Sequence, residues 1–160
     1  MTRSKTNRDA EDIYSRPGHL IRRLQQIAVA IFMEQTAEFG ITPVQYSALL
    51  AVRNHPGIDQ TGLMKIVAFD RSTIGDVVKR LEHKRLVRRT SSDADGRTKI
   101  LFITPSGQGL LSKVKKAVDA AQDKIVSPLS REEQREFMRM MRKLVQLNNN
   151  HSRAPLQTRD

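Results

Sequence analysis

The 160-residue chain has a formal net charge of +11, from 28 Lys and Arg against 17 Asp and Glu, and a pI of about 10.6. This length suits one domain, and the positive excess suits a polyanionic partner. Without cysteine the chain has no disulfide, no thiol redox sensor and no Cys-ligated metal, and no apolar run approaches the roughly 20 residues of a membrane span. We therefore expect a cytoplasmic protein with no membrane segment and no cofactor.

Both ends of the chain are polar, so we expect a flexible arm over residues 1–16 and a disordered tail over residues 151–160. After the arm, the pattern predicts a helix over residues 17–39. A proline begins this helix and Gly40 is its expected C-terminal stop, because glycine readily adopts the left-handed conformation that ends helices.

Three further helices follow in the first half of the chain. Thr42 and Gln45 have the spacing of a capping box, which predicts a helix over residues 43–54. Residues 59–67 and 71–84 then form two short helical segments separated by a three-residue turn. A short helix, a tight turn and a second helix are the arrangement of a helix-turn-helix motif.

The second helix of this pair has two distinct sides. Apolar side chains recur at i, i+3, i+4 and i+7 and form one inward-facing stripe: Ile74, Val77, Val78 and Leu81. The other side and its flanks are polar: Arg71, Ser72, Thr73, Asp76, Lys79, Arg80 and His83. Short hydroxyl groups at the start of such a helix suit base edges and phosphates of DNA. The alternative is a solvated amphipathic helix in an unrelated fold.

Two β-prone runs, residues 86–92 and 98–103, predict a hairpin whose turn contains Asp95 and Gly96. Basic side chains crowd its strands and turn: Arg88, Arg89, Arg97 and Lys99. Arg97, beside the turn, is placed to enter a minor groove of DNA, where narrow A·T-rich sequence concentrates negative potential. Asp93 or Asp95 can hold this arginine through a charge-assisted hydrogen bond.

The acidic turn allows two other interpretations. Asp-x-Asp-Gly resembles the start of a calcium loop, but the later ligands and the glutamate at loop position 12 are missing. A catalytic carboxylate pair is also conceivable, although no nearby residue would serve as its partner. Both interpretations are weaker than that of a DNA-binding wing, and the chain has no predicted metal site.

The C-terminal part predicts a helix over residues 105–126 and a last helix that Ser130 caps. The apolar faces of these helices and of the helix over residues 17–39 exceed what a small module needs. We therefore predict a mainly α fold: a winged helix-turn-helix over residues 42–104, with dimerisation helices at residues 17–41 and 105–150. In a two-fold dimer the second helices of the two motifs lie about 34 Å apart, one turn of DNA. The alternative is a helical bundle within a single chain.

Four segments together resemble the MarR family of bacterial transcriptional regulators: residues 42–49, 70–82, 93–97 and 101–107. The resemblance extends from about residue 19 to 147. It implies an obligate homodimer that represses transcription and releases operator DNA when a small, aromatic and anionic ligand binds. The sequence of residues 68–78, together with that of residues 25–32, is similar to those of the branch that controls breakdown of aromatic acids. Some members of this branch respond to aromatic acyl-CoA thioesters. Arg85 departs from the pattern, because family members usually have glycine there.

The resemblance also implies where an effector binds, namely between the dimerisation helices and the winged module. Polar residues there that can orient an anionic aromatic compound are His19, Arg22, Arg23, Gln26 and Tyr46. Four of these residues have a simpler possible role: the arginines as a solvated face or DNA-backbone contacts, His19 as a surface residue and Tyr46 as part of the core.

Two other classes of function compete with a ligand-responsive regulator. An enzyme is disfavoured, because the four histidines lack metal-type spacing, the single G-x-G lacks a third glycine, and no serine lies in a nucleophile elbow. A nonspecific architectural DNA-binding protein would bind independently of base sequence and would not respond to an effector. Ser72 and Thr73 favour sequence reading over that class.

Overall fold

In the computed structural model the described residues are 13–92 and 97–156. They form α-helices, three short 3-10 helices (η) and a small antiparallel sheet. In chain order the elements are η1 (Ile13–Ser15), α1 (Pro17–Gln35), η2 (Ala37–Phe39), α2 (Pro43–Asn54), β1 (Ile58–Asp59), α3 (Gln60–Val67), α4 (Arg71–His83), β2 (Val87–Ser91), β3 (Lys99–Ile103), α5 (Pro105–Val126), α6 (Arg131–Leu147) and η3 (Asn149–His151). The predicted class, mainly α with a β-hairpin, is confirmed.

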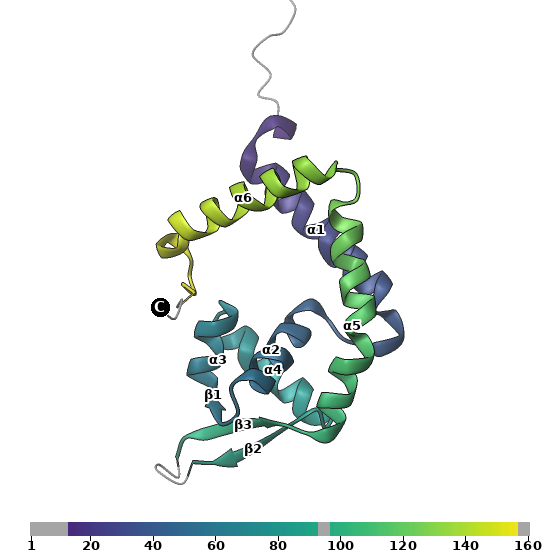
Figure 1. Ribbon diagram of the computed structural model, residues 1–160. Coiled ribbons are helices and arrows are strands. Elements are labelled where there is room, and N and C mark those ends of the chain that lie inside the picture. Colours follow the sequence, from purple (N-terminus) through teal and green to yellow (C-terminus); the bar gives the residue numbers. More distant parts are fainter. Residues whose placement is uncertain (1–12, 93–96, 157–160) are drawn as a thin grey trace, which may run out of the picture.

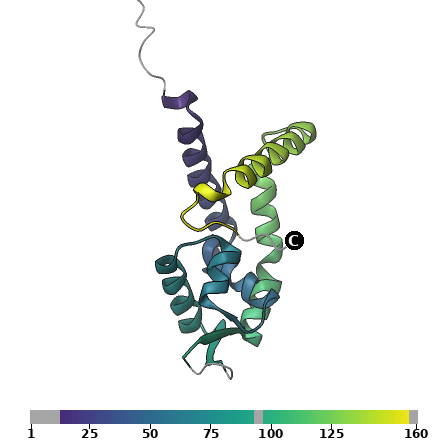
Figure 2. The same cartoon turned by 90° about the vertical axis from the view of Figure 1, so that its left-hand side faces the viewer.

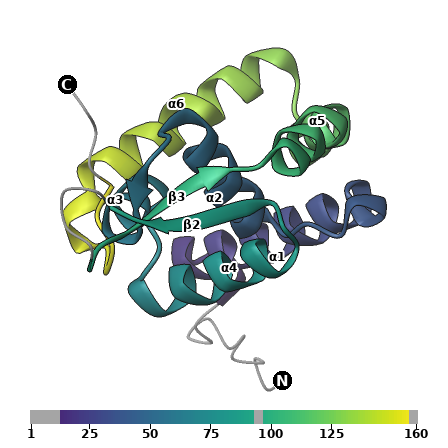
Figure 3. The same ribbon diagram turned by 90° about the horizontal axis from the view of Figure 1, so that it is seen from below.

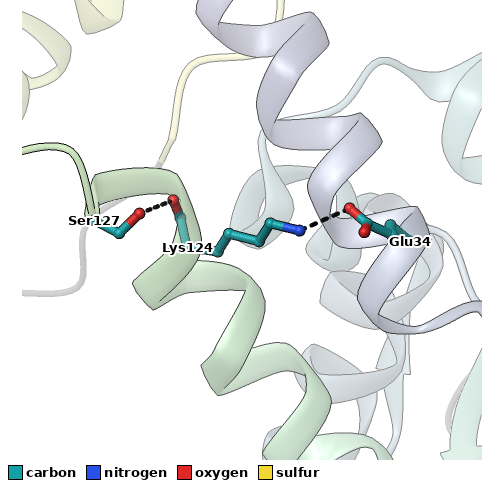
Figure 4. Close-up of polar contacts among 3 residues, drawn as sticks. All are labelled: Glu34, Lys124 and Ser127. Atoms are coloured by element: carbon teal, nitrogen blue, oxygen red, sulfur yellow. Dashed lines mark hydrogen bonds and ion pairs between the residues drawn. The ribbon is translucent and has the colours of Figure 1, made fainter.

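Helix α5 spans the molecule from one end to the other (Figure 1). Its N-terminus meets the hairpin β2–β3, and its C-terminus turns into α6 at the opposite end. Helix α1 packs along α5, and in the 90° view α5 continues downward beside the smaller elements of the central module (Figure 2). An ion pair joins α1 and α5, because Lys124 Nζ lies 2.9 Å from Glu34 Oε2 (Figure 4).

The sheet has the strand order β1-β3-β2, and both pairings are antiparallel. In the hairpin, Val87 faces Ile103 and Ser91 faces Lys99. Strand β1 was not expected, and it pairs Ile58 with Leu101. Two residues are too short to produce a recognisable alternation, and their partner is more than 40 residues away, so the sequence pattern could not reveal this strand.

The central module, residues 42–104, contains most of the buried core. Its largest fully enclosed side chains are at most 1% exposed: Leu49, Val52, Leu63, Ile74, Val78, Leu81 and Leu101. The apolar stripe predicted on residues 71–84 is confirmed, because all four of its members are buried. Helix α4 is therefore fixed by its apolar side, and its polar side faces outward.

Capping side chains begin the five helices α2 to α6. Thr42, Asp59, Asp70, Thr104 and Ser130 each accept a hydrogen bond from the backbone N–H three residues later. The capping box at Ser130 is complete, but at Thr42 only half of it forms. Gln45 turns inward instead, is 4% exposed, and its Oε1 accepts a hydrogen bond of 3.2 Å from Lys84 Nζ.

The prediction that the first helix runs to Phe39 is wrong by four residues. The α-helix ends at Gln35, and the chain continues to Phe39 as η2. The buried Thr36 hydroxyl donates to the Phe32 carbonyl at 2.8 Å, and such local side-chain bonds compete with the regular helix. Gly40, with a φ of 57°, has the expected left-handed conformation, but it ends η2 and not the α-helix.

Short structured segments lie within both predicted flexible ends, while residues 1–12 and 157–160 lie outside the described residues. Residues 13–15 form η1, and Tyr14 packs edge-on against His19. At the other end, Asn149 hydrogen-bonds through its side-chain amide to both the N–H and the C=O of Leu156, each at 2.9 Å. These two hydrogen bonds give local structure to part of the segment for which a disordered tail was expected.

Candidate nucleic-acid interface

Asp70 organises the start of α4. Its Oδ1 accepts hydrogen bonds from the Thr73 N–H at 2.9 Å and the Ser72 hydroxyl at 2.7 Å, and its Oδ2 accepts from the Thr73 hydroxyl at 3.1 Å. These bonds, the backbone one first, lower the pKa of Asp70 to about 2. Because both hydroxyl protons point at Asp70, the two oxygens offer lone pairs outward. They are then suited to accept hydrogen bonds from donors such as base amino groups.

The predicted polar side of α4 is exposed as a continuous row. Arg71, Ser72, Asp76, Lys79 and Arg80 are exposed, and Thr73 is half-buried because its hydroxyl turns toward Asp70. The row lies at the same end of the molecule as the hairpin, and a view from that end shows α4 beside β2 and β3 (Figure 3). A helix and a ribbon of this kind can contact two neighbouring grooves of one duplex.

The turn between α4 and β2 fixes the helix relative to the hairpin. Arg85 has a φ of 57°, and its N–H bonds to the Glu82 carbonyl at 2.8 Å while the Leu86 N–H bonds to the Leu81 carbonyl at 2.9 Å. These two bonds form a Schellman motif, whose left-handed position is usually glycine. The residue that departs from the family pattern therefore lies in the conformation that disfavours a side chain.

Helix α5 completes this junction. The Thr104 hydroxyl donates to the Arg85 carbonyl at 2.7 Å and accepts from the Gly107 N–H at 3.1 Å. A Cβ at Gly107 would overlap the Leu86 carbonyl oxygen, and it would lie 2.8 Å from a side-chain carbon of Ile103. Gly107 is therefore required for close approach of α5 to the strands, a role that the sequence did not reveal.

Contacts within the hairpin hold its basic side chains in place. The Arg88 guanidinium lies 4.4 Å from the centre of the Phe102 ring, and Lys99 Nζ donates to the Ser91 hydroxyl at 2.7 Å. Arg89, which we did not assign to the site, pairs with Glu82 of α4 at 2.8 Å. Arg97 is exposed in the turn, two residues before β3. The suggested supporting residues, Asp93 and Asp95, lie outside the described residues.

The structure separates the predicted effector residues into two groups. His19, Arg22, Arg23 and Gln26 lie on the first turns of α1, where Arg23 donates to Gln26 at 3.0 Å. Tyr46 lies on α2 with its ring 6.0 Å from that of Phe32. Phe32 is six residues beyond Gln26, roughly 9 Å along the helix. Within one chain these five side chains do not converge, so their joint role stays a prediction.

The described residues also bear on two other features, a metal site and a membrane span. No group of three or more His, Asp or Glu side chains among residues 13–92 and 97–156 is arranged to hold a metal ion. Across the same residues, none of the helices is both long and apolar enough to span a bilayer.

Comparison with known proteins identifies the architecture. A model of the MarR family matches residues 39–98. The chain is 30% identical over 139 residues to the HTH-type transcriptional repressor NicR of Pseudomonas putida, covering 87% of this chain and 88% of that protein. Among solved structures, PcaV of Streptomyces coelicolor with its natural ligand superposes with a TM-score of 0.79 and 32% identity, covering 86% of this chain and 96% of that one. BpsR of Bordetella bronchiseptica, whose DNA binding is regulated by 6-hydroxynicotinic acid, gives 0.78 and 26%, with 82% and 94% covered.

Proposed function

This chain belongs to the MarR family, and from that premise we propose that it is a homodimeric repressor that a small aromatic anion releases from its operator. Transcriptional repression of the MarR type is the established part, and such regulators are DNA-binding proteins without enzymatic activity, which removes the enzyme class. The dimer, the operator contacts and the ligand class are the proposed part, together with action in the cytoplasm.

The observation that supports DNA binding most strongly is the shared orientation of α4 and the hairpin. The exposed row from Arg71 to Arg80 and the basic strands lie at one end of the molecule, fixed to each other by the junction at Arg85 and Thr104. We assign base contacts to Ser72, Thr73 and Asp76, and phosphate contacts to Arg71, Lys79, Arg80, Arg88 and Lys99. Arg97 enters the minor groove beside the site.

Exposed apolar side chains support the dimer. Leu20, Ile21 and Ile27 on α1 are 45–55% exposed, and Leu144 and Val145 on α6 are 53% and 59% exposed. A second copy that covers these faces buries them and places two α4 helices one turn of DNA apart. An isologous contact needs no other partner, because each chain supplies both halves of the interface.

The effector class rests on relatives and on charge. PcaV and BpsR are described with a natural ligand and with 6-hydroxynicotinic acid. In this chain His19, Arg22, Arg23, Gln26 and Tyr46 are the proposed contacts for an aromatic acid or its CoA thioester, brought together by dimer assembly. By linkage, such a ligand displaces DNA only to the extent that it binds the released form more tightly than the DNA-bound form.

The competing function is an architectural protein that binds any duplex, and one experiment separates the two. Purified protein is titrated with the DNA upstream of its own gene and with a scrambled duplex at about 150 mM salt, with and without aromatic acids and their CoA thioesters. We expect preference for the native duplex and loss of binding with one class of compound. Equal binding to both duplexes, unaffected by every compound, would establish the architectural function.

Variants assign the roles of individual residues in the same assay. Arg97→Ala should weaken binding to both duplexes and lower the dependence on salt, whereas Ser72→Ala or Thr73→Ala should change which duplex is preferred. Lys113→Gln, on the exposed side of α5, is the control with the same loss of charge as Arg97→Ala. If Arg97→Ala matches this control in affinity and salt dependence, Arg97 is not a DNA contact.

A further inference from the structure

A groove of about 910 Å³ lies where α5 turns into α6, at the end of the molecule opposite the hairpin. Three arginines of α6, Arg131, Arg135 and Arg142, line it together with the apolar side chains of Val126 and Met138. We propose that this groove binds a small molecule that carries more than one phosphate group, with the three guanidinium groups as its phosphate-binding side chains.

The three arginines have no partner within the described part of the chain. None of their guanidinium groups has a hydrogen bond or an ion pair there, and two of the three glutamates of α6 are engaged elsewhere. The third, Glu132, is exposed and does not line the groove. Glu133 accepts the Ser130 N–H at 2.7 Å, and Glu136 pairs with Arg139. Asp123 lines the groove as its one carboxylate but is outnumbered three to one. Like charges four residues apart on a helix are unfavourable, so an anionic ligand would relieve this arrangement.

Binding of the operator does not account for these charges. Helix α5 has 22 residues, so its two ends are roughly 33 Å apart, and the hairpin is at the other end. A duplex bound at α4 and the hairpin does not reach the groove. The face is also distinct from the apolar stripe of α6 that contains Phe137, Met140 and Leu144, because the two lie roughly 165° apart around the helix axis. A second copy can cover the stripe without covering the arginines.

The corner between the helices is rigid enough to hold a site. The Gln134 side-chain amide donates to the carbonyls of Val126 and Leu129, at 3.2 and 2.9 Å. The Ser127 hydroxyl donates to the Lys124 carbonyl at 3.0 Å, and Lys124 itself is held by Glu34 on α1 (Figure 4). These bonds fix the backbone from which the first two arginines project.

The spacing of the arginines indicates the class of ligand. Arg131 and Arg135 are one turn apart and can grip one phosphate or a diphosphate, because the planar guanidinium matches phosphate oxygens in a bidentate way. Arg142 lies roughly 10 Å farther along the helix and requires a second anionic point. Met138, between them, offers an apolar contact for a flat group. A nucleotide with more than one phosphate has these three features.

The test uses the full-length protein and calorimetric titration at about 150 mM salt with inorganic phosphate, pyrophosphate, ADP, coenzyme A and adenosine. We expect binding to be tightest for ADP or coenzyme A, weaker for inorganic phosphate and absent for adenosine. The triple variant Arg131→Gln, Arg135→Gln, Arg142→Gln should bind roughly tenfold more weakly or worse. No binding of any phosphate compound to the wild type would overturn the proposal.

A matched control removes the same net charge outside the groove, through Lys113→Gln, Lys116→Gln and Lys143→Gln. We expect this control to retain affinity within about twofold, a change much smaller than the loss of one charged hydrogen bond. Equal losses in both triple variants would mean general electrostatic attraction and would overturn the site. Arg135→Lys keeps the charge but loses the planar fork, so an intermediate loss is expected.

This inference stands apart from the proposed DNA function. The groove variant should bind operator DNA like the control, since its substitutions lie far from α4. Failure to bind nucleotides with DNA binding intact would remove only the groove site. Loss of DNA binding in the groove variant alone, with its thermal unfolding unchanged, would place the arginines in the DNA interface and would also overturn the proposal.

Discussion

Helices α4 and α6 are both amphipathic, but only α4 buries its apolar side chains within the chain. Helix α4 buries Ile74, Val77, Val78 and Leu81 in the central module, each at most 8% exposed. Helix α6 buries none of its residues, and Leu144 on its apolar stripe is 53% exposed. The same type of sequence pattern is therefore satisfied within the chain in one place and left open in the other.

The two helices therefore differ in whether their apolar faces are buried by residues of the same chain. Burying a leucine side chain stabilises a protein by about 1.5–3 kcal/mol, so the open stripe on α6 is a large unused contribution. The central module buries its apolar side chains with its own residues, whereas α1 and α6 keep large apolar side chains exposed that another surface could cover. We propose that this surface is a second copy of the chain.

The largest difference in stability is expected between substitutions on the buried side of α4 and on the exposed stripe of α6. Leu81→Ala removes a side chain that is 0% exposed and should lower the free energy of unfolding by about 2–5 kcal/mol. Leu144→Ala on α6 should change the unfolding of the monomer by about 0.5 kcal/mol or less. Urea unfolding at several protein concentrations measures both. Equal effects at the lowest concentration would mean that α6 packs within its own chain.

The next effect tests the junction between α5 and the strands. Gly107→Ala places a Cβ against the Leu86 carbonyl and should cost about 1–3 kcal/mol of stability. Gly109→Ala, two residues later in the same helix, meets nothing within 4 Å and should stabilise by about 0.5–1 kcal/mol. Thermal unfolding compares the pair, and a loss of stability in both would show that the junction is not specially tight.

A smaller effect of opposite sign is expected at Arg85. Because Arg85 occupies the left-handed position of a Schellman motif, Arg85→Gly should stabilise by about 1 kcal/mol and raise Tm by about 2–4 °C. Arg85→Ala removes the same charge but keeps a Cβ in the strained conformation, so it serves as the control. A rise in Tm with Arg85→Ala as large as with Arg85→Gly would attribute the effect to charge.

The smallest effect concerns the cap of α4. The pKa of Asp70 is about 2 in the folded chain against an ordinary 3.8, so its carboxylate contributes stability above pH 4 that is lost as the pH falls toward 2. Asp70→Asn keeps a capping oxygen and removes this titration, so Tm should fall less steeply between pH 4 and 2. Asp76→Asn on the same helix is the control. An unchanged slope in Asp70→Asn would contradict the assigned cause.

Local signals in the sequence predicted much of the fold. The N-cap residues Thr42 and Ser130, the left-handed conformation of Gly40 and the stripe that begins at Ile74 depend on neighbours within a few residues, and the structure confirms them. What the sequence missed depends on distant partners. Strand β1 forms because Leu101 pairs with it. The Gln45 side chain does not complete the capping box at Thr42, because it bonds to Lys84, which is distant in sequence but close in space.

The candidate site shows the same division between local and distant causes. The exposed residues of α4 followed from helical periodicity, since the apolar stripe determines which side faces outward. The role of Asp70 was open to sequence reasoning, because an aspartate before a helix is a frequent cap. The stacking of Arg88 on Phe102 and the pairing of Arg89 with Glu82 required the strand register and the helix position. The effector residues were placed by resemblance, and one chain does not bring them together.

The proposed dimer is tested most directly by the oligomeric state of a variant on the exposed apolar stripe of α6. Sedimentation velocity should show wild-type dimers and Leu144→Glu monomers, while circular dichroism shows that the variant keeps its helices. Gln146→Glu, which adds the same charge on the polar side of α6, should remain dimeric. A wild-type monomer over the whole concentration range, or a Leu144→Glu variant that stays dimeric, would contradict the claim that the ends of the chain are completed by a second copy.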